Sequence, residues 1–191
     1  MKATESQENI ERQLASRLIQ GDPAAVVELI EQYADDVYRF VYHQVGGLAQ
    51  DAEDIVQETF ISALNAIHRF RGDSKLRTWL FSIAAHKIAD LYRRAKRKPE
   101  IVSQDVATLF HAEGLRPEQA VEHLEARQRV RQALSQLPPH YRTALVLKYV
   151  WEISVREICQ VMQRSEKSVE SILVRARRLL SKILEDGYDK A

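Results

Sequence analysis

The chain has few of the residues that interrupt or cross-link a fold, with 1 Cys, 5 Pro and 6 Gly among 191 residues. A single cysteine, Cys159, cannot form an internal disulfide, so a disulfide-stapled secreted scaffold is excluded. The low Pro and Gly content excludes collagen and low-complexity disorder. No apolar run approaches the roughly 18 residues that a membrane span needs, and the polar start, Met1 to Gln13, lacks the apolar segment of a signal peptide. We therefore expect a soluble protein of the cytoplasm.

The usual patterns of catalytic and metal sites are also missing from the sequence. The six histidines stand apart without paired metal-ligand spacing, and there is no Ser/His/Asp spacing or Gly-rich phosphate loop. A metal-dependent hydrolase would have to rely on the acidic cluster Asp51, Glu53, Asp54 and Glu58. Acidic residues at a helix start are usually partners of the helix dipole. We predict no catalytic residue, no metal and no cofactor, and hence a protein that is not an enzyme.

The formal net charge is only +1, but the charges are strongly segregated along the chain. Residues 1–66 carry a net charge of −8, residues 67–98 of +8, residues 99–128 of −4 and residues 129–191 of +5. Two basic blocks separated by acidic ones suggest two surfaces that face a polyanion, while the acidic faces serve another partner. The simpler alternative, solvated helix faces, stays open for any one block.

Helical periodicity dominates the first hundred residues. Asp22-Pro23 is typical of an N-cap followed by proline at the first helical position. The helix that follows is predicted to bury Val26, Leu29, Ile30, Tyr33, Val37, Phe40 and Val41. A second helix is expected from near Asp51, with Ile55, Val56, Phe60, Leu64 and Ile67 on its apolar face. After a loop at residues 69–74, a third helix from Leu76 to about Lys98 buries Leu80, Ala84, Ile88 and Leu91.

The remainder of the chain predicts a linker and a second helical unit. Residues 99–116 show no strong period and indicate an acidic linker. A long helix is expected from Pro117 to Leu137, with Val130 and Leu134 among its inward positions. Another runs from about Tyr141 to Val150, with Leu145, Val146 and Tyr149 on its inner face. The predicted fold is all-α, with two small helical domains joined by a flexible linker, and a single large bundle is the alternative.

The last 40 residues contain a helix-turn-helix pattern. Ser154 is a candidate N-cap for a helix that buries Val155, Ile158, Cys159 and Met162. A three-residue connection, 163–165, leads to a helix capped by Ser165 that buries Val169, Leu173, Ala176, Leu180 and Ile183. Two short helices with such a turn match the DNA-binding arrangement, although a helical hairpin with a solvated basic face gives the same pattern.

Aromatic and basic side chains alternate between residues 70 and 94. The set comprises Phe70, Arg71, Lys75, Arg77, Trp79, Phe81, Tyr92, Arg93 and Arg94. Aromatic faces stack on unpaired bases while Arg and Lys hold phosphates, so this composition suits single-stranded DNA. Taken individually, Trp79 and Phe81 are expected in the core.

Several of these motifs, in order and spacing, resemble bacterial sigma factors. Residues 51–60, the Phe70-Arg-Gly-Asp run, residues 78–84 and Asp90 with Arg93-Arg94 resemble sigma region 2. Residues 133–138, Ser154, 157–158, 168–169 and 175–177 resemble region 4. The compact plan is similar to the extracytoplasmic-function (ECF) group and covers roughly residues 14–184. The resemblance implies region 2 over 1–98, an acidic linker over 99–116 and region 4 over 117–187.

The resemblance also implies a role for each surface. The family docks the acidic helix onto the coiled coil of the large polymerase subunit, here through Asp51, Asp54, Gln57 and Glu58. It recognises and melts the minus-10 promoter element through the residues matching Phe70, Arg71, Lys75, Arg77, Trp79, His86, Lys87, Asp90, Arg93 and Arg94. It recognises the minus-35 element through those matching Lys167, Ser168, Glu170, Ser171, Val174, Arg175, Arg177 and Arg178. The linker is expected to lie along the product-RNA and active-site channels.

The implied function is promoter-specific initiation by core RNA polymerase, in a regulated stress or envelope response. Expected partners are the polymerase, promoter DNA and an anti-sigma protein that could hold the chain at the membrane without insertion. Four positions depart from the family pattern, namely His86, Gln163, Glu170 and Ile172. A left-handed backbone at Gln163 would be strained in a non-glycine residue. The main rival interpretation is a stand-alone helix-turn-helix regulator of duplex DNA.

Overall fold

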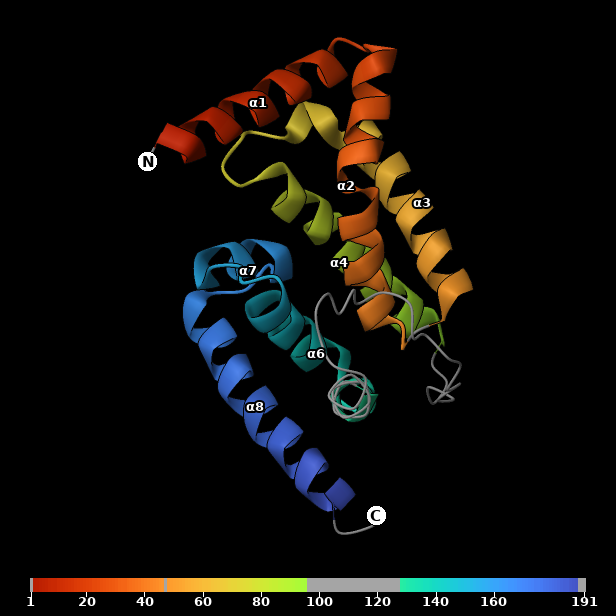
Figure 1. Cartoon of the computed structure of the whole chain (residues 1–191), viewed down its shortest axis with the longest axis vertical. Coiled ribbons are helices and arrows are strands. Elements are labelled where there is room, and N and C mark those ends of the chain that lie inside the picture. Colours follow the sequence, from red (N-terminus) through yellow and green to blue (C-terminus); the bar gives the residue numbers. More distant parts are fainter. Residues whose placement is uncertain (1, 47, 96–127, 189–191) are drawn as a thin grey trace, which may run out of the picture.

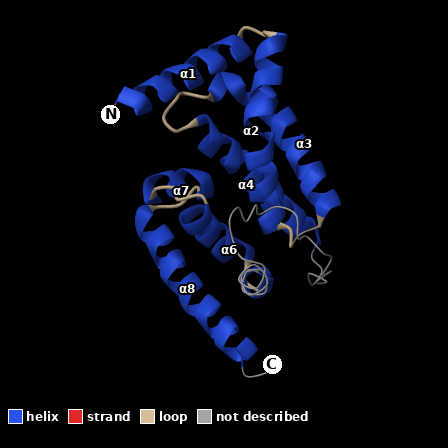
Figure 2. Cartoon of the chain, in the orientation of Figure 1, coloured by secondary structure: helices blue, strands red, loops and turns tan. Residues whose placement is uncertain are grey.

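The structure is a computed structural model that describes residues 2–46, 48–95 and 128–188. Within these ranges the chain is helical, with turns and short loops and no strand (Figure 2). The all-α prediction is confirmed. The predicted linker and most of the helix expected from Pro117 lie outside the described residues.

The N-terminal group of helices comprises α1 (Lys2–Ile19), α2 (Pro23–Gln44), α3 (Ala49–Ala66), the 3-10 turn η1 (Ile67–Arg69) and α4 (Leu76–Ala95). The predicted cap of α2 is confirmed, because Asp22 Oδ1 accepts the Ala24 N–H at 2.9 Å and Pro23 is the first helical residue. Gly21, at φ +77°, lets the chain turn sharply between α1 and α2.

The core of this group forms where α2 and α4 meet. Phe40 and Phe81 stack there with ring centroids 4.5 Å apart, and both are fully buried. The buried face of α2 follows Leu29, Tyr33, Val37, Phe40 and Val41, as predicted. The prediction for Ile30 is wrong, since 41% of this side chain is exposed. It lies one residue past Leu29, about 100° around the helix and off that face.

The C-terminal group comprises helical residues 128–135, α6 (Pro139–Leu145), the π-helical turn η2 (Val146–Val150), α7 (Val155–Met162) and α8 (Glu166–Tyr188). Its core includes Leu137, Leu147, Ile158, Val161 and Val169. Two inward predictions are wrong here, because Val130 is 42% and Tyr149 55% exposed. The π-helical turn widens the spiral after Leu145, so Tyr149 rotates away from the face that a 3.6-residue period predicts. Nothing in the structure of the described residues explains the exposure of Val130 in the same way, because it precedes this turn.

The two groups pack against each other, with α7 against α4 (Figure 1). Arg142 of α6, only 3% exposed, donates to the carbonyls of Leu134, Ser135 and Leu137 in its own group. It also donates to the Gln44 carbonyl at the end of α2. The Trp151 and Phe81 rings lie in a T-shaped arrangement with centroids 4.9 Å apart. We call this contact region the seam between the two groups.

His43, near the end of α2, gives the fold a dependence on pH. Burial, with the nearby Arg131 and Arg39 guanidinium groups, lowers the pKa of His43 to about 4. In the unfolded chain it titrates near pH 6.5, so between pH 6.5 and 4 the unfolded state binds more protons. The free energy of unfolding should therefore decrease as the pH is lowered through this window. At pH 5 it should be about 2 kcal/mol lower than at pH 7.5.

Urea unfolding of the wild type and of His43→Gln at both pH values measures this term. The difference in stability between the two proteins should shrink on acidification. His68→Gln, which removes an exposed histidine on η1, is the matched control and should follow the wild type. Parallel pH profiles for His43→Gln and the wild type would contradict the prediction.

Candidate polymerase and nucleic-acid interfaces

An acidic face runs along α3. Asp54, Gln57 and Glu58 are exposed and Asp51 is half-buried, at spacings of three and four that bring them to one side of the helix. Ile61 continues this face one turn further and is 52% exposed. Ile61 was not among the residues predicted for this face, although its position three residues after Glu58 places an apolar side chain on the acidic side of the helix. The face therefore combines several negative charges with one exposed apolar side chain.

Lys87 lies between this acidic face and the candidate DNA surface. Its Nζ is 3.4 Å from Glu58 Oε2, so it joins α4 to α3. The Glu58 side chain is 60% exposed, and a pair this accessible adds little stability. Lys87 was predicted to belong to the minus-10 surface. In the structure it pairs with Glu58 of the acidic face, so it lies between the two candidate surfaces.

The candidate minus-10 surface is built from the loop at residues 70–75 and one side of α4. The Phe70 and Trp79 rings, both half-buried, lie with centroids 5.4 Å apart at the base of the loop. Gly72 adopts φ +74°, which permits the turn there. A pocket of about 200 Å³ opens beside these rings, lined by both of them and by Arg71, Ser82 and Gln160 among others. Its aromatic walls offer faces on which a planar group can stack.

The helix places Trp79, His86, Asp90 and Arg93 on one side of α4 at intervals that keep them in line. Arg93 is exposed and paired with Asp90, and Arg71, Lys75 and Arg94 are also exposed. These cations lie where a polyanion can reach them. Phe81, by contrast, is fully buried, which confirms its place in the core.

Arg77 is oriented away from the others. Its guanidinium lies 3.4 Å from Asp36 of α2 and 5.5 Å from the centre of the Trp151 ring. The residue thus faces the seam, and the structure does not bring it to the side of α4 that carries His86 and Arg93. Arg77 directly follows Leu76, the first residue of α4, and nothing in this local sequence predicts that its side chain points toward the seam.

The helix-turn-helix is confirmed in the local geometry of α7 and α8. Ser154 caps α7 in a capping box, since its Oγ accepts the Glu157 N–H at 3.3 Å and Glu157 Oε2 accepts from the Ser154 N–H at 3.4 Å. Along α8, one contiguous side is exposed or half-buried and carries the predicted minus-35 residues. These are Lys167, Ser168, Glu170, Ser171, Val174, Arg175, Arg177 and Arg178.

Ile172 is one of the four positions that depart from the family pattern. In the structure it is 9% exposed and belongs to the core with Val169 and Leu173. Packing in the core therefore explains why this residue is apolar. A buried side chain of this kind is not available to recognise a base. Val161 of α7, which sequence analysis overlooked, is also fully packed at 1% exposure.

Other chemistry at these surfaces is limited. No group of three His, Cys, Asp or Glu side chains that could hold a metal ion occurs in residues 2–46, 48–95 or 128–188. Over the same residues, no helix combines the length and apolarity needed to cross a membrane. Burial raises the pKa of the Cys159 thiol, with the Glu166 carboxylate adding to the effect. The thiol is thus held in its less reactive protonated form.

Comparison with known proteins defines the class. The Sigma-70 region 2 family matches residues 29–98, and the Sigma-70 region 4 family matches residues 127–180. The two matches fall on the N-terminal and C-terminal helical groups. The chain is therefore built as a sigma factor for RNA polymerase.

Individual relatives define the group. The ECF RNA polymerase sigma factor SigW of Bacillus subtilis is 35% identical over 175 residues, which cover 87% of this chain and 92% of SigW. The sigma factor CnrH of Cupriavidus metallidurans is 31% identical over 189 residues, covering 96% and 98% of the two chains. The chain belongs to the ECF sigma factors, which direct transcription initiation.

Solved structures agree with this assignment. The structure of CnrH in complex with the cytosolic domain of CnrY superposes with a TM-score of 0.66 at 28% identity, covering 92% of this chain and 97% of CnrH. The fold is also shared with the sigma factor RpoE of Bartonella quintana, solved with the anti-sigma factor NepR. That match has a TM-score of 0.62 at 20% identity and covers 83% and 95% of the chains.

Gln163, which ends α7, holds the strained conformation expected from the sequence, at φ 51°. Glycine adopts this left-handed geometry without steric cost, so Gln163→Gly should raise the free energy of unfolding by about 0.5–1 kcal/mol. Gln160→Gly, the same substitution three residues earlier inside α7, should lower it by about 1 kcal/mol. Urea unfolding of both variants measures the pair, and a shift of both in the same direction would contradict the strain.

Proposed function

We propose that the three surfaces divide the work of promoter-specific initiation. The acidic face of α3 docks onto core RNA polymerase, the 70–75 loop with α4 recognises and melts the minus-10 element, and α8 recognises the minus-35 element. One observation supports this assignment. The exposed side chains on α3, on the 70–75 loop with α4, and on α8 lie in the stretches of the chain that match sigma regions 2 and 4. Polymerase performs the nucleotidyl transfer, and this chain supplies recognition without catalysis.

The contacts across the seam support a separation of the two helical groups during promoter recognition. Gln160 of α7 lies on the wall of the pocket beside Phe70 and Trp79. Thr78 of α4 donates to Glu157 Oε1 of α7 at 3.1 Å. A DNA strand that enters the pocket therefore meets α7, so engagement of the minus-10 surface requires α7 to move away from α4.

A regulatory partner fits the same picture. The related sigma factors CnrH and RpoE were solved with the cytosolic domain of CnrY and with the anti-sigma factor NepR, respectively. We extend this to the present chain and propose that an anti-sigma protein controls it in a regulated stress or envelope response. Such a partner can hold the factor in the cytoplasm or beside the membrane until a signal releases it.

Reconstitution tests the function directly. Purified protein, core polymerase and a library of promoter-like duplexes are combined, and the transcribed sequences are identified. We expect transcription from a two-element motif with polymerase present, and weak binding of the free protein to the same DNA. Tight, sequence-specific duplex binding by the free protein, without stimulation of polymerase, would favour the rival regulator.

Charge reversal tests the docking face. Asp54→Lys with Glu58→Lys should weaken binding to core polymerase by about tenfold or more. The reason is that the new lysines would repel the positive charges that a partner of the acidic face presents. Both residues are exposed, so the fold should persist. Competition against a labelled wild-type protein for core polymerase measures the change.

The matched control uses the same substitutions on another helix. Glu31 and Asp35 of α2 are exposed and also four residues apart. Glu31→Lys with Asp35→Lys makes the same change in net charge and should bind polymerase within about twofold of the wild type, since salt screens exposed charges that lie outside the interface. Equal losses in the two double variants would contradict docking through α3.

Glu170 tests recognition by α8. Its carboxylate is exposed on the side that carries Lys167 and Arg178, and it can accept from a cytosine amino group. In that case Glu170→Ala should cost about 1–3 kcal/mol on the preferred promoter and relax the preference at one base pair. Promoter selection with wild-type and variant holoenzymes measures this. An unchanged motif with uniformly stronger binding would mean that Glu170 only repels phosphate.

A further inference from the structure

Glu11 is a buried acidic residue whose role the family assignment does not cover. It lies on α1 and is only 7% exposed. The region 2 family match begins at residue 29, so α1 stands outside it. Burying a carboxylate is costly unless hydrogen bonds stabilise it, so its partners indicate what it does.

Both oxygens of Glu11 are engaged within the N-terminal group. Oε2 accepts the backbone N–H of Leu76 at 2.8 Å, and Oε1 accepts the Tyr33 hydroxyl at 3.3 Å. Leu76 is the first residue of α4. The carboxylate therefore lies at the N-terminus of that helix, where the free N–H groups and the helix dipole favour negative charge.

The local sequence of α4 explains why the acceptor comes from a distance. Helices usually begin after a Ser, Thr, Asp or Asn whose side chain accepts a hydrogen bond from the first turn. The residue before Leu76 is Lys75, whose ammonium group can only donate. Glu11, 65 residues away along the chain, takes the place of that missing acceptor.

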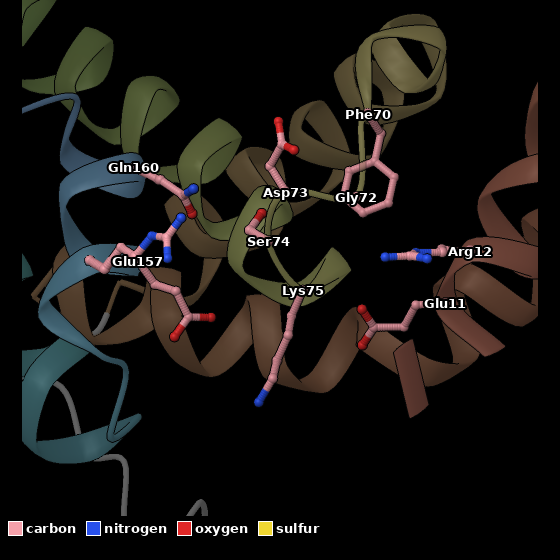
Figure 3. Close-up of a pocket in the computed structure, with 10 residues that line it drawn as sticks. Glu11, Arg12, Phe70, Gly72, Asp73, Ser74, Lys75, Glu157 and Gln160 are labelled. Atoms are coloured by element: carbon pink, nitrogen blue, oxygen red, sulfur yellow. The ribbon is translucent and has the colours of Figure 1, made fainter. Parts of the chain in front are cut away.

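The neighbouring residue of α1 touches the loop itself. Arg12 lies against Gly72, so that a Cβ added to Gly72 would be 3.7 Å from Arg12 Nε. Figure 3 shows Glu11 and Arg12 extending from α1 toward the segment that carries Phe70, Gly72 and Lys75. Helix α1 also packs on η1, immediately before the loop. Two adjacent residues of one helix thus contact the loop and the start of α4.

Helix α1 is itself held firmly. Leu14 is 1% and Leu18 6% exposed, and both belong to the core of the group. The carboxylate is therefore presented from a fixed support. Arg156, Glu157 and Gln160 of α7 line the far side of the same cavity of about 330 Å³, but neither hydrogen bond of Glu11 involves them. Both hydrogen bonds are made within the N-terminal group and need no contact with the C-terminal group.

We propose that Glu11 is a positioning residue for minus-10 recognition. It fixes the first turn of α4, and with it the 70–75 loop and Trp79, in the geometry that takes the DNA strand. The proposal rests on the minus-10 role given to this surface under the proposed function. Helix α1 thereby becomes part of the recognition module, although it lies outside the family match.

Three substitutions separate hydrogen bonding from charge and bulk. Glu11→Gln keeps an acceptor oxygen at the same reach and removes the charge. Glu11→Met has a similar length and gives no comparable acceptor for the N–H. Glu11→Asp keeps the charge and withdraws the carboxylate by one carbon–carbon bond, about 1.5 Å. Val37→Ala, in the buried face of α2 away from the loop, serves as a control for general loss of stability.

The first readout is spectroscopic and needs neither polymerase nor DNA. In a Trp151→Phe background, Trp79 is the single tryptophan of the chain. Its emission maximum should shift in Glu11→Met and Glu11→Asp, because the packing of Trp79 on Phe70 changes with the first turn of α4. The maximum should stay in place in Glu11→Gln and in Val37→Ala.

The second readout is promoter opening by holoenzyme at a saturating concentration of each variant. Glu11→Met and Glu11→Asp should open a duplex promoter about tenfold more slowly, and should discriminate less among minus-10 sequences, because misplaced reacting groups lose rate. Glu11→Gln should remain within about twofold of the wild type. A promoter with a pre-melted minus-10 element should reduce the defect, and binding to core polymerase should be unchanged.

The outcomes distinguish this proposal from the function on which it rests. If wild-type protein does not open promoters with polymerase, the proposed function fails, whatever Trp79 reports. If the wild type is active and Glu11→Met matches it in both readouts, the positioning role is wrong. Equal promoter defects in Val37→Ala and Glu11→Met would reduce Glu11 to a stability residue. Should Glu11→Met fail to fold, the contrast between Glu11→Asp and Glu11→Gln decides.

Discussion

The ring of Phe81 is the contact on which most of the architecture depends. It stacks on Phe40 of α2 at 4.5 Å, and it forms a T-shaped pair with Trp151 of the C-terminal group at 4.9 Å. Aromatic pairs of this kind contribute about 0.5–1.5 kcal/mol each beyond their buried area. Because Phe81 lies in the second turn of α4, the same ring orients the start of α4 in its own group and places α7 and η2 beside it.

That orientation determines which residues of α4 face outward. With Phe81, Ala84 and Ile88 buried, the helical period turns Trp79, His86, Asp90 and Arg93 toward the opposite side. The basic block seen in the sequence thus becomes a surface only because an apolar face lies behind it. Arg77 shows the same rule from the other direction. It precedes Phe81 by one helical turn, so it shares the inner side, and its charge is balanced by Asp36 and by the Trp151 ring.

The sequence was sufficient where a feature is local. The Asp22-Pro23 cap and the N-cap at Ser154 follow from side-chain chemistry within a few residues. It failed where a feature depends on distant partners. Tyr149 was misplaced because a π-helical turn changes the phase of the helix, and Arg142 was not noticed because its acceptors are carbonyls. Glu11 escaped for the same reason, since Leu76 and Tyr33 are 65 and 22 residues away.

The seam differs from the cores on either side of it in being partly polar. Gln44 is fully buried there, and within the described residues its Nε2 and the Nε1 of Trp151 have no hydrogen-bond partner. Each such buried donor opposes association by about 1–3 kcal/mol, and both are released to water when the groups separate. Arg142 keeps its three carbonyl partners in the C-terminal group after separation, so no buried cation is left uncompensated. An interface of this composition holds the two folded groups together but still allows them to separate. Under the function proposed above, α7 flanks the pocket beside Phe70 and Trp79 in one state and leaves it in another, and an interface of this kind permits both states.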